Sequence, residues 1–192
     1  PGRAKPLWHG PPWDFVQAGA RVDGSYEPGD MEDVVDAEGR FIGRGPANPQ
    51  SKILARIWTR QPEEIIDDAF FRRRLESALR LRQALALPAT ETNCYRLVNS
   101  EGDGLSGLTV DVYNDVVAVQ ISALGIYRRR DVVFDLLQTL LRPRAIAMLS
   151  ADIAKQEGFA VASAVVHGES ATTVCRENRV VYEVDLLAAQ KT

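Results

Sequence analysis

Short runs of alternating apolar and polar residues fill the first third of the chain. In the clearest run, Lys52 to Thr59, the side chains of Ile53, Ala55 and Ile57 fall on one side of an extended strand. Similar runs, separated by glycine and proline turns, cover residues 13–16, 20–22, 31–36 and 40–43. Short strands at this spacing predict a small β-barrel over residues 1–62, which ends where Pro62 interrupts strand pairing.

Helical periodicity begins after this proline. Apolar residues recur every three to four positions from about Asp68 to Leu87, where Asp67 or Asp68 can cap the helix and Pro88 ends it. A second amphipathic helix is predicted over residues 130–141. Alternating segments around it predict strands at residues 95–98, 108–112, 116–121, 145–148, 161–167, 172–174 and 180–184. The predicted fold class is therefore α+β, with the barrel over 1–62, a linker over 63–67, and a central α/β domain over 68–192 that contains a mixed or antiparallel sheet.

A glycine-rich turn lies between the first two strands of this central domain. Its glycines at positions 102, 104 and 107 predict a tight hairpin, because glycine accepts positive φ and close backbone approach. The same glycines fit the G-x-G-x-x-G spacing, but no helix follows them, so the strand–turn–helix context of a dinucleotide site is missing. The acidic residues around the turn, Glu101, Asp103 and Asp111, are predicted to bond locally rather than to form an acid–base pair or a metal site.

The charge balance limits how the chain can bind nucleic acid. The net charge is −3, and neither half is basic: residues 1–62 carry 8 basic and 8 acidic side chains, and residues 63–192 carry 15 and 18. Any RNA contact must therefore come from a local patch. No apolar run approaches the roughly 20 residues of a membrane span, so no membrane partner is predicted. Cys94 and Cys175 lack metal-ligand spacing and are predicted to be buried, reduced thiols of a cytoplasmic protein.

Two segments are candidates for such a patch. In the loop from Gly43 to Lys52, Arg44 and Lys52 can pair with phosphates, while Asn48 and Ser51 offer uncharged hydrogen bonds. On chemistry alone, this loop fits a polar turn shaped by its glycines and prolines better than a binding site. The helix after Pro62 carries Arg72 and Arg73 on a polar arc, and an ordinary solvated helix face is the alternative.

Motifs along almost the whole chain, from Gly2 to Thr192, resemble one family. They are Gly-Arg-Gly followed by Asn-Pro-x-Ser within residues 43–51, DAFFRRRL at 68–75, YRLV at 95–98, GDGL at 102–105, Asp-x-Tyr at 111–113 and the terminal Gln190-Lys191-Thr192. The family is the PUA-domain-containing, S-adenosylmethionine-dependent methyltransferases that make 5-methylcytosine in large-subunit ribosomal RNA. The chain departs from it at Gln50, where the family usually has arginine, and within residues 148–158, where family arginines are missing.

The resemblance implies that residues 1–62 form a PUA-like RNA-binding barrel, and it favours RNA binding by the candidate loop. In that family, a Rossmann-like domain with the S-adenosylmethionine site and the cysteine nucleophile follows the run that Gln190 and Lys191 match. We therefore expect the chain to be the RNA-recognition and positioning part of a 23S-type rRNA cytosine-5 methyltransferase. It would hold no catalytic residue, metal or cofactor itself, and Gln190 and Lys191 would lie near the active site of the intact enzyme.

Two other interpretations stay open. The chain can be a stand-alone, non-catalytic RNA-binding module, or a scaffold whose PUA-like part binds protein. The expected partner is ribosomal RNA, a homodimer is possible, and the expected location is the cytoplasm.

Overall fold

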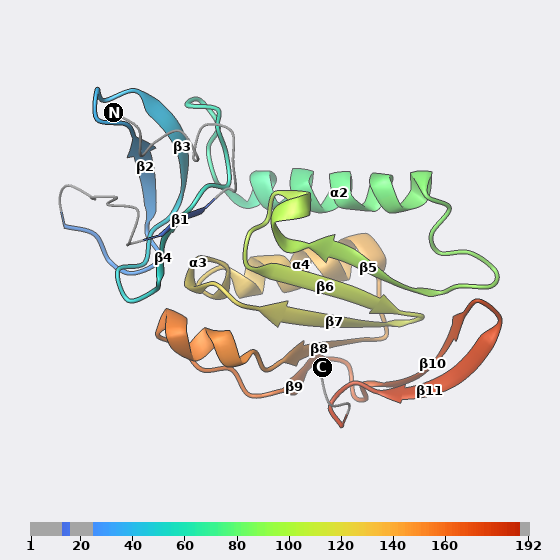
Figure 1. The fold of residues 1–192 in the computed structure, drawn as a ribbon. Coiled ribbons are helices and arrows are strands. Elements are labelled where there is room, and N and C mark those ends of the chain that lie inside the picture. The colour runs from blue at the N-terminus through green and yellow to red at the C-terminus, as the bar shows by residue number, and fades with distance from the viewer. Residues whose placement is uncertain (1–12, 16–24, 189–192) are drawn as a thin grey trace.

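The computed structural model describes residues 13–15 and 25–188. We call the described residues up to Pro62 the N-terminal part and residues 68–188 the central part. The strands of the N-terminal part are β1 (Trp13–Phe15), β2 (Met31–Val35), β3 (Phe41–Pro46) and β4 (Ile53–Arg56) (Figure 1). The predicted strand at 20–22 lies outside the described residues.

These strands do not close into a barrel within the described residues, so the barrel prediction needs correction. β1 pairs with β4 and β2 pairs with β3, each antiparallel, as separate two-stranded sheets. Isolated β-bridges connect β3 and the residue after it to β4 and the residues after it. They pair Arg44 with Thr59 and Ala47 with Ala55. The strands span three to six residues, and the register shifts in both pairs, so no continuous ladder forms around the group.

The central part is a mixed five-stranded sheet with helices on one face, which confirms the α+β class. Its main elements are α2 (Asp68–Ala84), β5 (Cys94–Asn99), β6 (Leu108–Tyr113), β7 (Val116–Ile121), α4 (Arg130–Leu141), β8 (Ala145–Leu149), β9 (Ala164–His167), β10 (Thr172–Glu177) and β11 (Val180–Asp185). Three short helices connect them: η2 (Ser100–Asp103), α3 (Leu124–Tyr127) and η3 (Asp152–Glu157). The strand order is β5-β6-β7-β8-β9, and only the β7–β8 pair is parallel.

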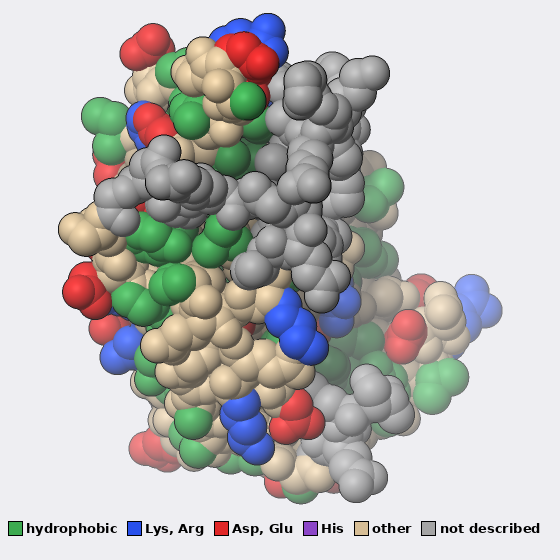
Figure 2. All heavy atoms as spheres, turned by 60° about the vertical axis from the view of Figure 1, so that its left-hand side comes forward, with side chains coloured by type: hydrophobic (Ala, Val, Ile, Leu, Met, Phe, Trp, Pro, Cys, Tyr) green, Lys and Arg blue, Asp and Glu red, His purple; other side chains and the backbone are tan. Residues whose placement is uncertain are grey.

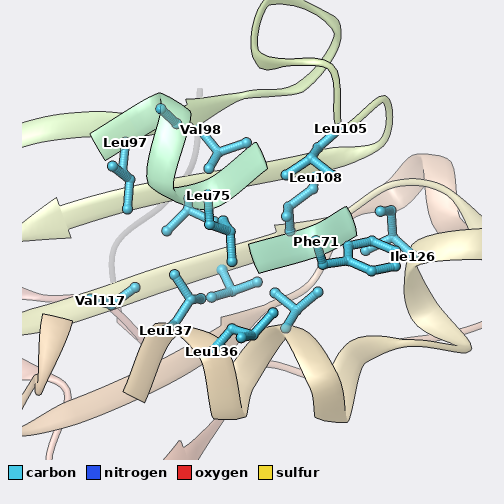
Figure 3. Packing of buried hydrophobic residues seen from close by; sticks show 14 of the residues in the cluster. Phe71, Leu75, Leu97, Val98, Leu105, Leu108, Val117, Ile126, Leu136 and Leu137 are labelled. Carbon is cyan, nitrogen blue, oxygen red and sulfur yellow. The ribbon is translucent and has the colours of Figure 1, made fainter. Parts of the chain in front are cut away.

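The main core lies between the sheet and helices α2 and α4 (Figure 3). Helix α2 begins as predicted, because the Asp67 carboxylate accepts the backbone N–H of Phe70 at 2.9 Å. Phe71 and Leu75 from α2 and Leu137 from α4 are almost fully buried. The periodic apolar positions of both helices thus face the sheet, as the sequence predicted.

The opposite face of the sheet is partly covered by the β10–β11 hairpin, drawn in red in Figure 1. Alanines at positions 118, 145 and 147 leave room there for Val184 of the hairpin to pack against the smaller core. β5 and β6 pair as the predicted hairpin, but the connection is not tight, because residues 100–107 lie between the strands and include the short helix η2. Gly104 and Gly107 adopt the expected positive φ, at 70° and 94°.

Trp58 joins the N-terminal part to the main core. Its ring stacks on Phe70 with centroids 6.4 Å apart and meets the edge of Phe71 at 5.4 Å. Its indole N–H donates to the carbonyl of Ser106 at 3.3 Å. Trp58, two residues after the end of β4, is therefore part of the central packing.

Candidate nucleic-acid interface

The candidate loop, Gly43 to Lys52, begins within β3 and runs to the start of β4, and its residues Asn48 and Ser51 contact η3 of the central part. Asn48 and Ser51 are buried in this contact. The Asn48 side-chain amide donates to the Glu157 carbonyl at 2.9 Å and to its carboxylate at 3.3 Å, and the Ser51 hydroxyl donates to the same carboxylate at 2.5 Å. Both side chains are therefore used inside the chain, and RNA binding by them stays a prediction.

Arg56 completes this buried polar cluster, although no motif or spacing in the sequence had indicated it. Its guanidinium donates to Glu157 at 3.0 Å and to the hydroxyl of Ser106 at 3.2 Å. Glu101 lies 3.8 Å from the guanidinium and accepts the Ser106 hydroxyl at 2.7 Å. Burial alone would raise the pKa of Glu101, but hydrogen bonds from Ser106 and the backbone and the Arg56 charge lower it overall.

Arg44 is held by a different set of partners. Its guanidinium forms two bonds to Asp33, at 2.5 and 3.0 Å, and donates to the carbonyls of Pro62 and Glu64 at 3.2 and 3.3 Å. The hydrogen bond to Asp33 raises the pKa of Arg44, although burial opposes it. This arginine therefore ties β2 and β3 to the segment that precedes α2.

Glu64 brings the predicted arginines of the loop and of α2 together. Arg73 donates to its carboxylate at 3.1 Å, and Arg74 approaches it at 3.5 Å. Burial would raise the pKa of Glu64, but hydrogen bonds from Thr59 and Arg73 outweigh it, so the carboxylate stays charged. Arg72, which directly precedes Arg73 in α2, is exposed.

Lys52 is exposed and is the last residue of the candidate loop. It follows Ser51, which binds Glu157, and so it lies on the η3 side rather than beside Glu64. The structure thus brings Arg44 and Arg73 together around Glu64, whereas Lys52 follows a residue that contacts η3. Gln190 and Lys191 lie outside the described residues.

The surface charge is mixed rather than basic. In Figure 2, which brings the N-terminal part forward, Lys and Arg side chains are scattered among Asp and Glu. This agrees with the balanced charge of the sequence. An RNA contact on this face would therefore involve a few phosphates.

Among the acidic residues around the glycine-rich turn, Asp103 accepts the nearby backbone N–H of Asn99, as expected, but Asp103 and Asp111 also bind arginines 21 and 15 positions away in the chain. Asp103 binds Arg82 through both carboxylate oxygens, at 2.7 and 2.8 Å, and Asp111 binds Arg96 at 2.8 and 3.2 Å. The part of the chain that the structure describes contains no group of three or more side chains that could hold a metal ion. Among the same residues, no helix is both long and apolar enough to cross a membrane.

The two cysteines come together, which their separation in sequence did not indicate. Cys94 on β5 lies 3.0 Å from the hydroxyl of Tyr182 on β11, and it contacts the carbonyl of Arg176 at 3.4 Å. Burial and the adjacent Cys94 thiol raise the pKa of Cys175 to about 11. Cys94 is half-buried and lines a groove of about 530 Å³, whereas Cys175 is fully buried.

Comparison with known proteins adds the family context. Residues 1–60 match the family model described as a PUA-like domain. The chain is 39% identical over 194 residues to ribosomal RNA large subunit methyltransferase I of Alteromonas mediterranea, covering 100% of the chain and 49% of that relative. It is 40% identical over 170 residues to the protein of that name in Escherichia coli, covering 88% of the chain and 42% of the relative.

Those relatives are longer. The chain spans about half the length of the curated relatives it matches. Solved structures share the fold. SMU.776, provisionally described as a methyltransferase and crystallised with SAH, matches with a TM-score of 0.79 and 18% identity, over 96% of this chain and 46% of its own. A Streptococcus mutans protein, provisionally described as a SAM-dependent methyltransferase, matches with a TM-score of 0.78 and 19% identity, with the same coverage.

Proposed function

We propose that this chain is the RNA-recognition and positioning part of a SAM-dependent rRNA methyltransferase that modifies C5 of a cytosine. The observation that carries the proposal is the 39% identity, over the full chain, to proteins named ribosomal RNA large subunit methyltransferase I. The PUA-like match over residues 1–60 supports an RNA-binding unit at 1–62, joined by residues 63–67 to a central domain at 68–192.

We place the methyl-donor site and the nucleophile outside residues 1–192. A cytosine-5 methyltransferase uses an activated thiolate, whereas Cys175 is fully buried and its raised pKa keeps it protonated. The glycine-rich turn leads into β6 and not into a helix, so it does not form a Rossmann-type donor pocket. Gln190 and Lys191 would border the active site of the intact enzyme.

Phosphate contacts would come from the exposed cations of the predicted set. Arg72 and Lys52 are exposed, and Arg73 can exchange its surface pair with Glu64 for an RNA phosphate at little cost. Arg44 would contribute less directly, because its guanidinium holds the backbone at residues 62–64. Asn48 and Ser51 would position the loop that presents Lys52.

Filter binding of the chain to large-subunit rRNA fragments at several salt concentrations tests this proposal. Replacing Lys52, Arg72 and Arg73 together with glutamine should weaken binding and reduce the salt slope by about one for each lost phosphate contact. Arg142→Asn is the control, since Arg142 is exposed at the far end of α4 and Asn tolerates its left-handed backbone (φ 49°).

The outcomes separate the alternatives. Unchanged affinity and slope in the triple variant would exclude these three side chains as the RNA contacts. Absence of RNA binding by the unaltered chain would favour a protein-binding scaffold. RNA binding without methyl transfer by the natural protein, supplied with S-adenosylmethionine, would favour a stand-alone RNA-binding module.

A further inference from the structure

Glu157 carries a buried carboxylate that accepts hydrogen bonds from both the N-terminal part and the central part of the chain. Its side chain is 4% exposed, and it lies at the end of η3 in the central part. Three donors reach it from the N-terminal part: Asn48 at 3.3 Å, Ser51 at 2.5 Å and Arg56 at 3.0 Å. A fourth, the backbone N–H of Leu124 at the start of α3, approaches at 3.4 Å.

We propose that Glu157 is a positioning residue that fixes the orientation of the N-terminal part on the central sheet, and so sets the spacing between the RNA-contacting cations. The orientation claim depends only on contacts within the chain. The claim about RNA rests on the proposed function. The residues of the family-like Asn-Pro-x-Ser run then act chiefly as a docking element, which we call the Glu157 latch (Asn48, Ser51, Arg56 and Glu157).

The latch consists of buried polar groups that depend on one another. A buried carboxylate is tolerated when a cation and several hydrogen-bond donors satisfy it, and here each donor sits on a strand or loop of fixed geometry. Arg56, 7% exposed at its side chain, is in turn shared between Glu157 and Ser106, with Glu101 nearby. Moving the N-terminal part away would remove three of the four donors around Glu157 and separate the Arg56 guanidinium from this carboxylate.

Close backbone contacts flank the latch and limit sliding. Gly125 of α3 lies so near Pro46 of β3 that a Cβ at position 125 would overlap the proline ring. Gly158, just after Glu157, has φ 82°, a left-handed backbone conformation that other residues rarely adopt, and it lies against the Gln50 side chain. Gly125 therefore allows an approach of α3 to β3 that a larger residue would block, and this approach helps to hold the two parts in one register.

The latch joins the two parts of the chain that carry the two groups of predicted RNA contacts. Lys52 follows Ser51 directly, whereas Arg72 and Arg73 belong to α2 of the central part. A fixed latch keeps these cations at one separation, so a single RNA can bind both groups with the advantage of a linked, two-site contact. A broken latch would leave each group able to bind alone.

The orientation is tested with paired spin labels on the chain. Labels at Glu38→Cys and Glu169→Cys, both exposed positions on opposite sides of the latch, would be placed in a Cys94→Ser background, leaving only the buried Cys175 thiol. The unaltered latch should give one narrow distance distribution by pulsed electron paramagnetic resonance. Glu157→Ala should broaden or shift it, and Ser51→Ala should do so to a smaller extent.

Controls keep this test decisive. Glu183→Ala removes an exposed carboxylate from β11 and should leave the distribution unchanged. If Glu157→Ala does not fold, Glu157→Gln keeps the size of the side chain but puts an amide among four donors, and it should broaden the distribution. A narrow, unshifted distribution in either folded Glu157 variant would overturn the proposal.

RNA binding separates this inference from the proposed function. With the latch broken, affinity for an rRNA fragment should fall several-fold and the salt slope should decrease by about one, because Lys52 and the α2 arginines no longer bind together. Unchanged affinity with an altered distance distribution would overturn the role in RNA spacing. If the unaltered chain binds no RNA, the proposed function fails, and the distance measurement still decides the role of Glu157.

Discussion

The two arginine–aspartate pairs beside the glycine-rich turn form a matched test of how much burial contributes to stability here. In each pair an aspartate binds an arginine through both oxygens. Arg82 and Asp103 are 11% and 5% exposed at their side chains, whereas Arg96 and Asp111 are 52% and 18% exposed. Asp103→Asn and Asp111→Asn make the same chemical change in two environments.

Breaking the buried pair should lower the free energy of unfolding far more than breaking the exposed pair. In the Asp103 variant, an amide N–H₂ must face the Arg82 guanidinium, and the backbone N–H of Asn99, now 2.6 Å from the carboxylate, loses its charged acceptor. Breaking one side of a buried pair costs about 3–5 kcal/mol. Arg82 keeps its bond to the carbonyl of Arg96 at 2.9 Å, so the lower end, about 3 kcal/mol, is expected. The exposed pair should cost at most about 1 kcal/mol.

Thermal and urea unfolding, followed by circular dichroism, measures the difference. For a chain of this size, the estimates correspond to a lower Tm by roughly 6–12 °C for Asp103→Asn and by at most roughly 4 °C for Asp111→Asn. Equal losses in the two variants, or a larger loss for Asp111→Asn, would refute the argument. It would mean that the turn between β5 and β6 is not held by the buried ion pair.

The sequence was most reliable where periodicity and local chemistry decide structure. The second helix was predicted over the residues that α4 occupies, and the first differed only at its C-terminal end. There, the apolar spacing continues to Leu87, but the helix ends at Ala84 and Ala86 has φ 58°. The left-handed residue ends the backbone bonding before Pro88 can do so.

The absence of a closed barrel among the described strands could not be predicted from alternation alone. Alternating residues indicate strands, but not which strands pair or for how long. Gly45 lies so close to the carbonyl of Arg56 that a Cβ there would overlap it, so β3 and the end of β4 cross closely instead of running as a continuous ladder. That close approach depends on a residue 11 positions away.

Asn48 and Ser51 were singled out in the sequence, but their contacts with Glu157 were not predicted. Asn48 and Ser51 are polar, lie in a loop and match a family motif, which are the properties of both a ligand contact and a buried docking element. The partner that distinguishes the two, Glu157, is more than 100 positions away and looks like an ordinary surface acid in the sequence. A buried carboxylate is recognised only once the donors around it are known.

Two further predictions concern Asp115, which lies between β6 and β7, and the two cysteines. The Arg144 guanidinium lowers the pKa of Asp115 below its ordinary 3.8, so the stability it contributes is present above that pH and is lost as pH falls through the lower folded value. Asp115→Asn should therefore show a smaller loss of urea resistance between pH 6 and pH 3 than the unaltered chain. The second prediction is that Cys94 and Cys175, the only cysteines, form a disulfide when hydrogen peroxide is supplied. The two thiols give up two hydrogens, and the peroxide is reduced to two waters. Because Cys94 lines the groove and Cys175 is buried, peroxide should first oxidise Cys94 to a sulfenic acid and release one water. The Cys175 sulfur then attacks the Cys94 sulfur, and the hydroxyl group leaves as the second water. The raised pKa of Cys175 makes that second step slow at neutral pH and faster as pH rises toward about 11. Mass spectrometry should show an intramolecular disulfide whose formation accelerates with pH, and Cys94→Ser should abolish it. Formation of cross-linked dimers with no internal bond would show that the two strands do not hold the thiols together.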